Sequence, residues 1–230
     1  LCFAICLDNW IILAIPFLVL LITQTVLNYR PIYFLLWASI PFSMEIFFSN
    51  TLATDLPSEP LMLGLTLVYL LKFLGQRKTL NWTFIKHPVS IFLLIHYGWI
   101  LFSTFCSNVP LLSLKFSLAK FWYIIPFFYL VAEEIKRPKD FKIIFWSIFI
   151  PLVLATTKVV LHHAMLDFGF KEINTAVRPF FRNHVNYAAI LTLFIPYTFF
   201  MLTSERKWTT KWWALLIGLG VLFSGIMFSY

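Results

Sequence analysis

The sequence has few charged residues and few cysteines. Asp, Glu, Lys and Arg make up 12% of the 230 residues, about half of the roughly 25% that is usual in soluble domains. A water-facing globular surface needs more charge than this, so a soluble domain is excluded. The three cysteines show no CxxC or Cys/His metal spacing and, being odd in number, give no disulfide framework.

Acidic residues are especially scarce. The chain has 10 Asp and Glu against 18 Lys and Arg, which gives a net charge of +8. In a soluble protein this excess would point to nucleic acid as a partner. Here the basic residues lie between long apolar runs, so membrane topology explains them better. We therefore expect no nucleic-acid partner.

Hydrophobic residues dominate what remains. They make up 60% of the chain, with 27 Phe and 9 Trp, more large rings than one buried core of this size holds. The apolar runs are continuous rather than alternating, which favours membrane helices of ~20 residues and disfavours strands. We predict an all-α, polytopic transmembrane helix bundle in a lipid bilayer, with about eight spans. The predicted spans are 10–27, 32–48, 61–74, 89–105, 118–132, 143–161, 187–202 and 213–230.

The basic residues give these spans an orientation. Twelve of the 18 Lys and Arg residues lie in every second loop, and the positive-inside rule makes those loops cytoplasmic. Residues 1–9, 49–60, 106–117 and 162–186 then lie outside. The remaining six cations break the rule and need another explanation. They are Lys115, Lys120, Lys158, Lys171, Arg178 and Arg182.

Two arginines and a histidine precede the span at 187–202. Arg178 and Arg182 are four residues apart and would share a face of a helix, although Pro179 disfavours helix at Arg178. Two guanidiniums suit bidentate binding of phosphate or pyrophosphate, and His184 suits proton donation or orientation of an acceptor hydroxyl. Alternatively, the arginines bind lipid headgroups nonspecifically and His184 packs as a polar interface residue.

Other outer residues are weaker candidates. Lys115 and Lys120 either bind a lipid phosphate or extend to the headgroups from an apolar surface. Glu59 either binds substrate through a carboxylate at a surface cleft, which Glu45 would share, or belongs to a Pro-fixed turn that starts the next helix.

No cofactor pattern is present. His162 and His163 lie near Asp167, but adjacent side chains diverge and no third ligand has suitable spacing. Walker, dinucleotide-binding and HExxH motifs do not occur. We expect no metal and no cofactor.

Three stretches resemble the O-antigen ligase and O-antigen polymerase superfamily in its Bacteroidetes-like form. They are DLPSEPLM at 55–62, SLK with KFW at 113–122, and RPFFRNHVNYA at 178–188. The final FSY at 228–230 looks like the start of a Ser-Arg-rich motif.

The resemblance implies a metal-independent glycosyltransferase in a bacterial inner membrane, with a periplasmic active face. Such enzymes move a glycan from an undecaprenyl-pyrophosphate donor to a hydroxyl of lipid A core, of another glycan or of a protein, in lipopolysaccharide or surface polysaccharide assembly. The resemblance also implies that Arg178 and Arg182 bind the substrate, with Lys115 and Lys120 as weaker candidates. It implies a catalytic role for His184. The alternative class is a transporter or flippase of a polyprenyl-linked or anionic solute, which would show internal repeats or midplane charges.

The chain begins with Leu and ends inside an apolar run. In the family that it resembles, a large periplasmic loop with a histidine base would follow residue 230. We therefore expect residues 1–230 to form a single transmembrane domain, truncated before that loop and inactive alone.

Overall fold

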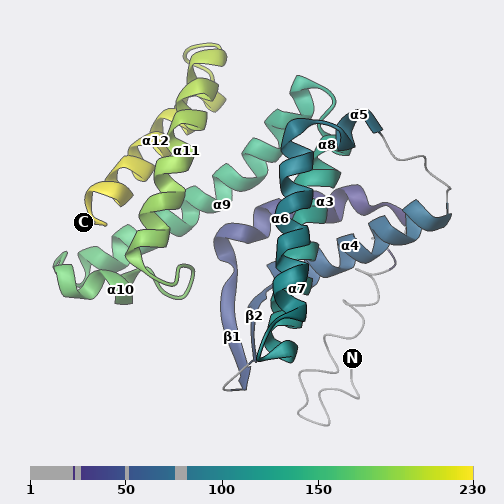
Figure 1. The fold of residues 1–230 in the computed structure, drawn as a ribbon. Coiled ribbons are helices and arrows are strands. Elements are labelled where there is room, and N and C mark those ends of the chain that lie inside the picture. Colours follow the sequence, from purple (N-terminus) through teal and green to yellow (C-terminus); the bar gives the residue numbers. More distant parts are fainter. Residues whose placement is uncertain (1–22, 24–26, 50–51, 76–81, 230) are drawn as a thin grey trace, which may run out of the picture. The chain divides into compact units, whose positions relative to one another are not determined.

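The computed structural model describes residue 23 and residues 27–49, 52–75 and 82–229 (Figure 1). Within this part, six helical segments are long and apolar enough to cross a membrane. They are α4 (Ser58–Gly75), α6 (Pro88–Phe105), the run Pro110–Glu134, α9 (Pro138–Ala164), α11 (His184–Ser204) and α12 (Thr210–Met227). Each coincides with one predicted span from 61–74 onward. The all-α, multi-pass membrane class is confirmed.

These helices carry large apolar side chains on their outer surfaces. In α6, Phe92, Ile95, Trp99 and Phe102 recur every three or four residues and are 59–73% exposed. A soluble protein does not leave such a stripe in water, whereas lipid tails cover it and the helix satisfies its own backbone hydrogen bonds. This face of α6 is the kind that lipid contacts.

The described chain forms two compact units. The first contains Leu1–Phe34 and Pro60–Phe141, and the second contains Leu35–Glu59 and Lys142–Tyr230. The expectation that residues 1–230 form a single transmembrane domain stays a prediction.

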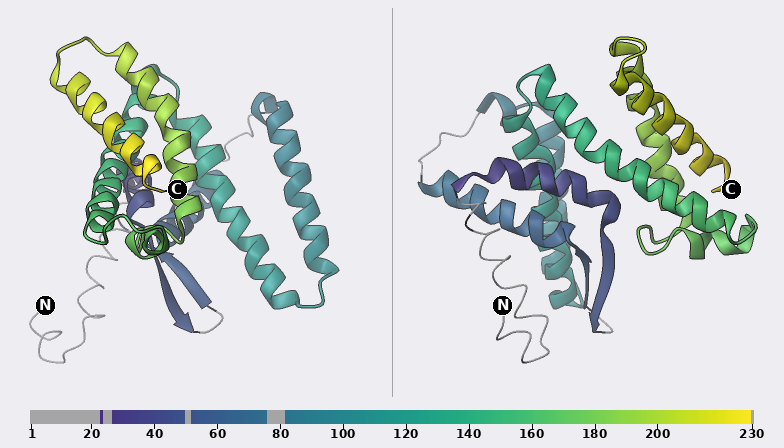
Figure 2. Two further views of the ribbon diagram at one scale, coloured as in Figure 1. Left: turned by 90° about the vertical axis from the view of Figure 1, so that its left-hand side faces the viewer. Right: turned by 180° about the vertical axis from the view of Figure 1, so that it is seen from behind.

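In the first unit, α6 and α7 (Pro110–Ile124) run antiparallel as a helical hairpin (Figure 2). The short α5 (Trp82–Ile85) precedes α6. A π-helical stretch, η2 (Ile125–Leu130), links α7 to α8 (Val131–Glu134). Pro126 lies in that stretch and has no N–H for the α-helical ladder, which accounts for the irregular turn.

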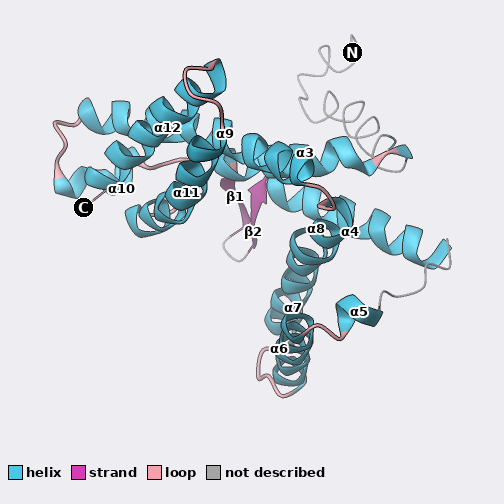
Figure 3. Cartoon of the chain, turned by 90° about the horizontal axis from the view of Figure 1, so that it is seen from above, coloured by secondary structure: helices cyan, strands magenta, loops and turns pink. Residues whose placement is uncertain are grey.

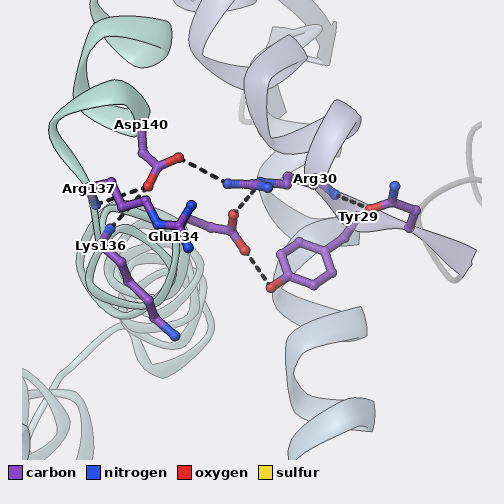
Figure 4. Close-up of polar contacts among 7 residues, drawn as sticks. Tyr29, Arg30, Glu134, Lys136, Arg137 and Asp140 are labelled. Atoms are coloured by element: carbon purple, nitrogen blue, oxygen red, sulfur yellow. Dashed lines mark hydrogen bonds and ion pairs between the residues drawn. The ribbon is translucent and has the colours of Figure 1, made fainter.

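A polar cluster in the first unit joins residues 29–30 to residues 134–140 (Figure 4). Arg30, at the start of α3 (Tyr29–Ser39), contacts Glu134 at 2.8 Å and Asp140 at 3.2 Å. Tyr29 donates its hydroxyl proton to Glu134 at 2.7 Å. Burial, together with this hydrogen bond, raises the pKa of Tyr29. Asp140 also accepts the backbone N–H of Arg137 at 3.0 Å, at the start of α9.

The predicted span at 32–48 is wrong. The chain leaves the α-helix at Ser39, makes one 3-10 turn, η1 (Ile40–Phe42), and forms the antiparallel strands β1 (Met44–Ser49) and β2 (Leu52–Leu56) (Figure 3). Pro41 cannot donate to a helical ladder, which favours a break there. The expectation against strands therefore fails at this hairpin. The predicted span at 10–27 lies almost entirely outside the described residues.

In the second unit, the long helices α9, α11 and α12 pack together. Two short elements, η3 (Phe170–Glu172) and α10 (Ile173–Ala176), lie between α9 and α11 in the chain. Leu152, Leu191 and Leu222, one from each long helix, are completely buried. The three helices approach closely at Gly225, where an added Cβ would lie 2.5 Å from the Tyr187 hydroxyl and 2.8 Å from Thr156 Cγ2. Small residues at such contacts are what close helix packing in membranes requires.

Candidate functional site

Arg182 is the centre of a charged cluster in the second unit. It lies in the non-helical segment between α10 and α11. Its Nη2 atom lies 2.8 Å from Glu45 Oε1 and 3.9 Å from Asp55 Oδ1. The hairpin and the segment before α11, more than 120 residues apart in the chain, therefore meet at this guanidinium.

The two carboxylates explain why a cation belongs here. Glu45 and Asp55 are paired directly opposite each other in the two-stranded sheet, and like charges in this arrangement repel. The guanidinium of Arg182 offsets that repulsion. Its side chain is 61% exposed, against 27% for Glu45 and 30% for Asp55. Exposed ion pairs are weak, typically about 0–1 kcal/mol, so an anionic ligand can compete for Arg182.

Glu59 supports the hairpin from the first turn of α4. Its Oε2 atom accepts the backbone N–H of Asp55 at 3.4 Å. The neighbouring Ser58 shares a 2.6 Å hydrogen bond with the hydroxyl of Ser43. Helix α4 begins at Ser58, directly after a turn at Pro57, and substrate binding by Glu59 stays a prediction.

Lys158 holds the segment that carries the arginines. Its Nζ donates to the carbonyl oxygen of Arg178 at 2.5 Å and lies 5.6 Å from the centre of the Phe180 ring. Phe180 in turn makes an edge contact with Phe42 at 5.5 Å, next to the hairpin. In the sequence, Lys158 is one of the six cations that break the positive-inside rule. Its carbonyl partner depends on a turn that the sequence does not specify.

The expected shared helical face of Arg178 and Arg182 is not formed. Residues 177–183 make turns rather than helix, and α11 begins at His184. Asn183 caps α11, since its side chain accepts the backbone N–H of Asn186 at 2.8 Å. Arg178 is exposed, and Lys158 contacts its carbonyl oxygen rather than its guanidinium.

His184 is fixed by one partner, Asn174 in α10. The Asn174 Oδ1 atom accepts the backbone N–H of His184 at 3.1 Å and lies 3.0 Å from its ring Nδ1. A backbone N–H only donates, so the amide atom facing it is the oxygen, and Nδ1 must carry a proton to complete the second bond. In the neutral ring the Nε2 lone pair is then available to accept a proton. No sequence pattern indicates that Asn174 and His184 are paired.

The remaining candidates, Lys115 and Lys120, belong to the other unit. Both lie in α7, where Lys115 is exposed and Lys120 lies 5.2 Å from the Phe116 ring. Their cooperation with Arg182 stays a prediction.

The adjacent histidines bind backbone carbonyls. His162 Nδ1 lies 3.3 Å from the carbonyl oxygen of Ala176, and His163 Nε2 lies 3.1 Å from that of Gly169. Among the described residues, no three His, Cys, Asp or Glu side chains come together as a metal site.

Comparison with protein-family models, with curated proteins and with solved structures gives no match to this chain. The cluster and the membrane helices define it as a multi-pass helical membrane protein with paired acidic and basic side chains in one unit. The resemblance to the O-antigen ligase superfamily stays an expectation.

Proposed function

We propose that this protein is a membrane glycan transferase of the O-antigen ligase type, which moves a glycan from an undecaprenyl-pyrophosphate donor to an acceptor hydroxyl. The observation that carries the proposal is the position of the exposed Arg182 guanidinium two residues before His184, whose Nε2 is available to accept a proton. Lipid pyrophosphate needs a cation, and an acceptor hydroxyl needs a proton acceptor. This segment offers both.

In the proposed reaction the acceptor oxygen attacks the anomeric carbon, and the bond from that carbon to the pyrophosphate oxygen breaks with inversion. His184 Nε2 orients the hydroxyl and takes its proton, a role that the resemblance alone would give to a histidine beyond residue 230. Negative charge grows on the departing pyrophosphate, where Arg182 and, with it, Arg178 stabilise it. Glu45 and Asp55 hold Arg182 until the donor arrives, because the weak exposed pairs exchange readily.

The test begins with binding of undecaprenyl pyrophosphate to the chain in nanodiscs, followed by native mass spectrometry. Arg182→Ala should weaken binding, and Arg182→Lys should not restore it fully, because Lys lacks the bidentate fork. Glu45→Gln should strengthen binding about two- to fivefold, since it removes a competitor for the guanidinium. Lys171→Ala is the matched control, an exposed cation in the same loop.

Glycan transfer in cells that depend on this protein provides the second measurement. Loss of one charge-stabilising donor typically costs about 10²–10³-fold in rate, so Arg182→Ala should abolish detectable transfer while membrane insertion is retained. Wild-type transfer in this variant would remove Arg182 from the mechanism. If the protein in proteoliposomes moves the intact lipid-linked glycan from one leaflet to the other but transfers no glycan, it is a flippase instead.

A further inference from the structure

A second polar region lies at the opposite end of α9 from Lys158, independent of the proposed transferase site. An open groove of about 510 Å³ is lined by Lys142, Ile143, Trp146, Ser147, Ile150, Glu205 and Lys211. These residues come from α9, from the end of α11 and from the start of α12, all in the second unit. Its volume lies within the roughly 300–1,000 Å³ usual for ligand sites.

The charges of this groove favour an anion. Lys142 and Glu205 neutralise each other in a 2.7 Å ion pair. Lys211 then gives the groove its net positive charge, in the first turn of α12, where the helix dipole is also positive. Arg206 lies in the loop just before it. Cations gathered at a helix N-terminus repel one another and the dipole unless an anion compensates them.

The apolar lining of the groove continues along α9. Ile143, Ile150 and Leu154 recur at helical spacing and are 45%, 52% and 56% exposed. From Ile143 to Leu154 the helix rises about 16 Å, which matches one leaflet of a hydrocarbon core about 30 Å thick. One end of this surface is positively charged, and the rest is apolar over the depth of one leaflet. An anionic phospholipid, with a charged headgroup and an apolar acyl chain of that length, complements it.

Tryptophans place the charged end at the membrane surface. Trp208, Trp212 and Trp213 form a ring cluster with centroids 5.1–5.6 Å apart, at the turn between α11 and α12. Tryptophan concentrates at the level of the lipid headgroups. The groove therefore lies where a phosphate and the first carbons of an acyl chain would be.

We infer that this groove is a specific site for an anionic phospholipid, whose headgroup phosphate binds Lys211 and whose acyl chain lies along Ile143, Ile150 and Leu154. Basic pockets between transmembrane helices on the cytoplasmic side bind anionic headgroups in the same manner, and the positive-inside rule predicts this end to be cytoplasmic.

The experiment places the 230-residue chain in nanodiscs that contain equal amounts of phosphatidylglycerol and phosphatidylethanolamine. Native mass spectrometry then measures which lipid stays bound to the protein. The wild type should retain phosphatidylglycerol preferentially. Lys211→Ala should reduce that retention about fivefold, the effect of one cation near a membrane surface, and Lys211→Arg should preserve it. Lys207→Ala is the matched control, with the same charge change on an exposed neighbour outside the groove.

Glu205→Gln separates the site from a folding defect. It removes the negative charge and releases Lys142, so retention of phosphatidylglycerol should increase, which a damaged protein would not show. Equal retention of the two lipids by the wild type would overturn the inference. So would equal losses in Lys207→Ala and Lys211→Ala, because they would indicate general surface charge rather than a site.

Discussion

At the residue scale, two positions in the segment at the start of α11 are held by partners in other elements. Arg182 is paired with Glu45, 137 residues earlier, and His184 is oriented by Asn174. The sequence predicted both Arg182 and His184 as candidates because each is polar at the start of an apolar span. It predicted neither partner, because pairing across strands and between short helical turns depends on the tertiary fold.

The pairing of His184 gives a prediction about Asn174 as a positioning residue. Asn174→Ala removes the acceptor that keeps the proton on Nδ1, so Nε2 is no longer held as the proton acceptor. If the proposed function holds, kcat for glycan transfer should fall about tenfold or more while KM stays near the wild-type value. Because residues 1–230 are expected to be inactive alone, kcat and KM are measured separately by steady-state kinetics of a membrane-inserted protein that also carries the loop expected after residue 230.

Two further variants separate positioning from folding. Asn174→Asp keeps an acceptor oxygen at the same place and should recover most of kcat. Asn186→Ala removes an exposed amide from the next turn and should leave both constants unchanged. A rise in KM alone for Asn174→Ala would assign the residue to substrate binding instead.

At the scale of the element, long helices were predictable and the hairpin was not. The six spans from 61–74 onward are continuous apolar runs of helical length, and each forms a helix. The run at 32–48 looks the same in composition, yet Pro41 and the cross-strand pairing of Glu45 with Asp55 convert its second half into β1. Apolar content alone does not distinguish a span from a helix followed by a strand.

The packing of α9, α11 and α12 gives a prediction at Gly225. An added methyl group would meet Tyr187, Leu191 and Thr156 at 2.5–2.8 Å, so Gly225→Ala should force the helices apart. Overpacking typically costs about 1–3 kcal/mol, which should appear as a lower melting temperature in detergent.

Gly220 on the same helix is the matched control for Gly225. An added Cβ there meets nothing within 4 Å, so Gly220→Ala removes only the helix penalty of glycine, up to about 1 kcal/mol. Its melting temperature should equal or exceed that of the wild type. Equal effects of the two substitutions would show that helix propensity, not packing, determines stability here.

At the scale of the whole molecule, the ion pairs of the described residues join segments near loops that the sequence predicts to share a side of the membrane. Arg30 contacts Glu134 and Asp140, and Lys142 contacts Glu205, all near loops predicted to be cytoplasmic. Arg182 contacts Glu45 near two loops predicted to be outside. Pairs of this kind link ends on the same side of a membrane, but the predicted grouping also required a span at 32–48, where the structure has a short helix and a strand. The grouping of the loops therefore stays a prediction. The ion pairs do not depend on which group faces the periplasm.

The orientation itself is tested with two exposed lysines on either side of α11, Lys171 before it and Lys207 after it. Lys171→Cys and Lys207→Cys are introduced singly after all three native cysteines are replaced by Ser. The positive-inside rule predicts that a membrane-impermeant maleimide labels Lys171→Cys in intact spheroplasts and labels Lys207→Cys only after permeabilisation. The reverse result would place Arg182 in the cytoplasm and contradict a periplasmic transferase. Labelling of both in intact cells would show that α11 does not cross the membrane, and the alternation of loops around it would then be wrong.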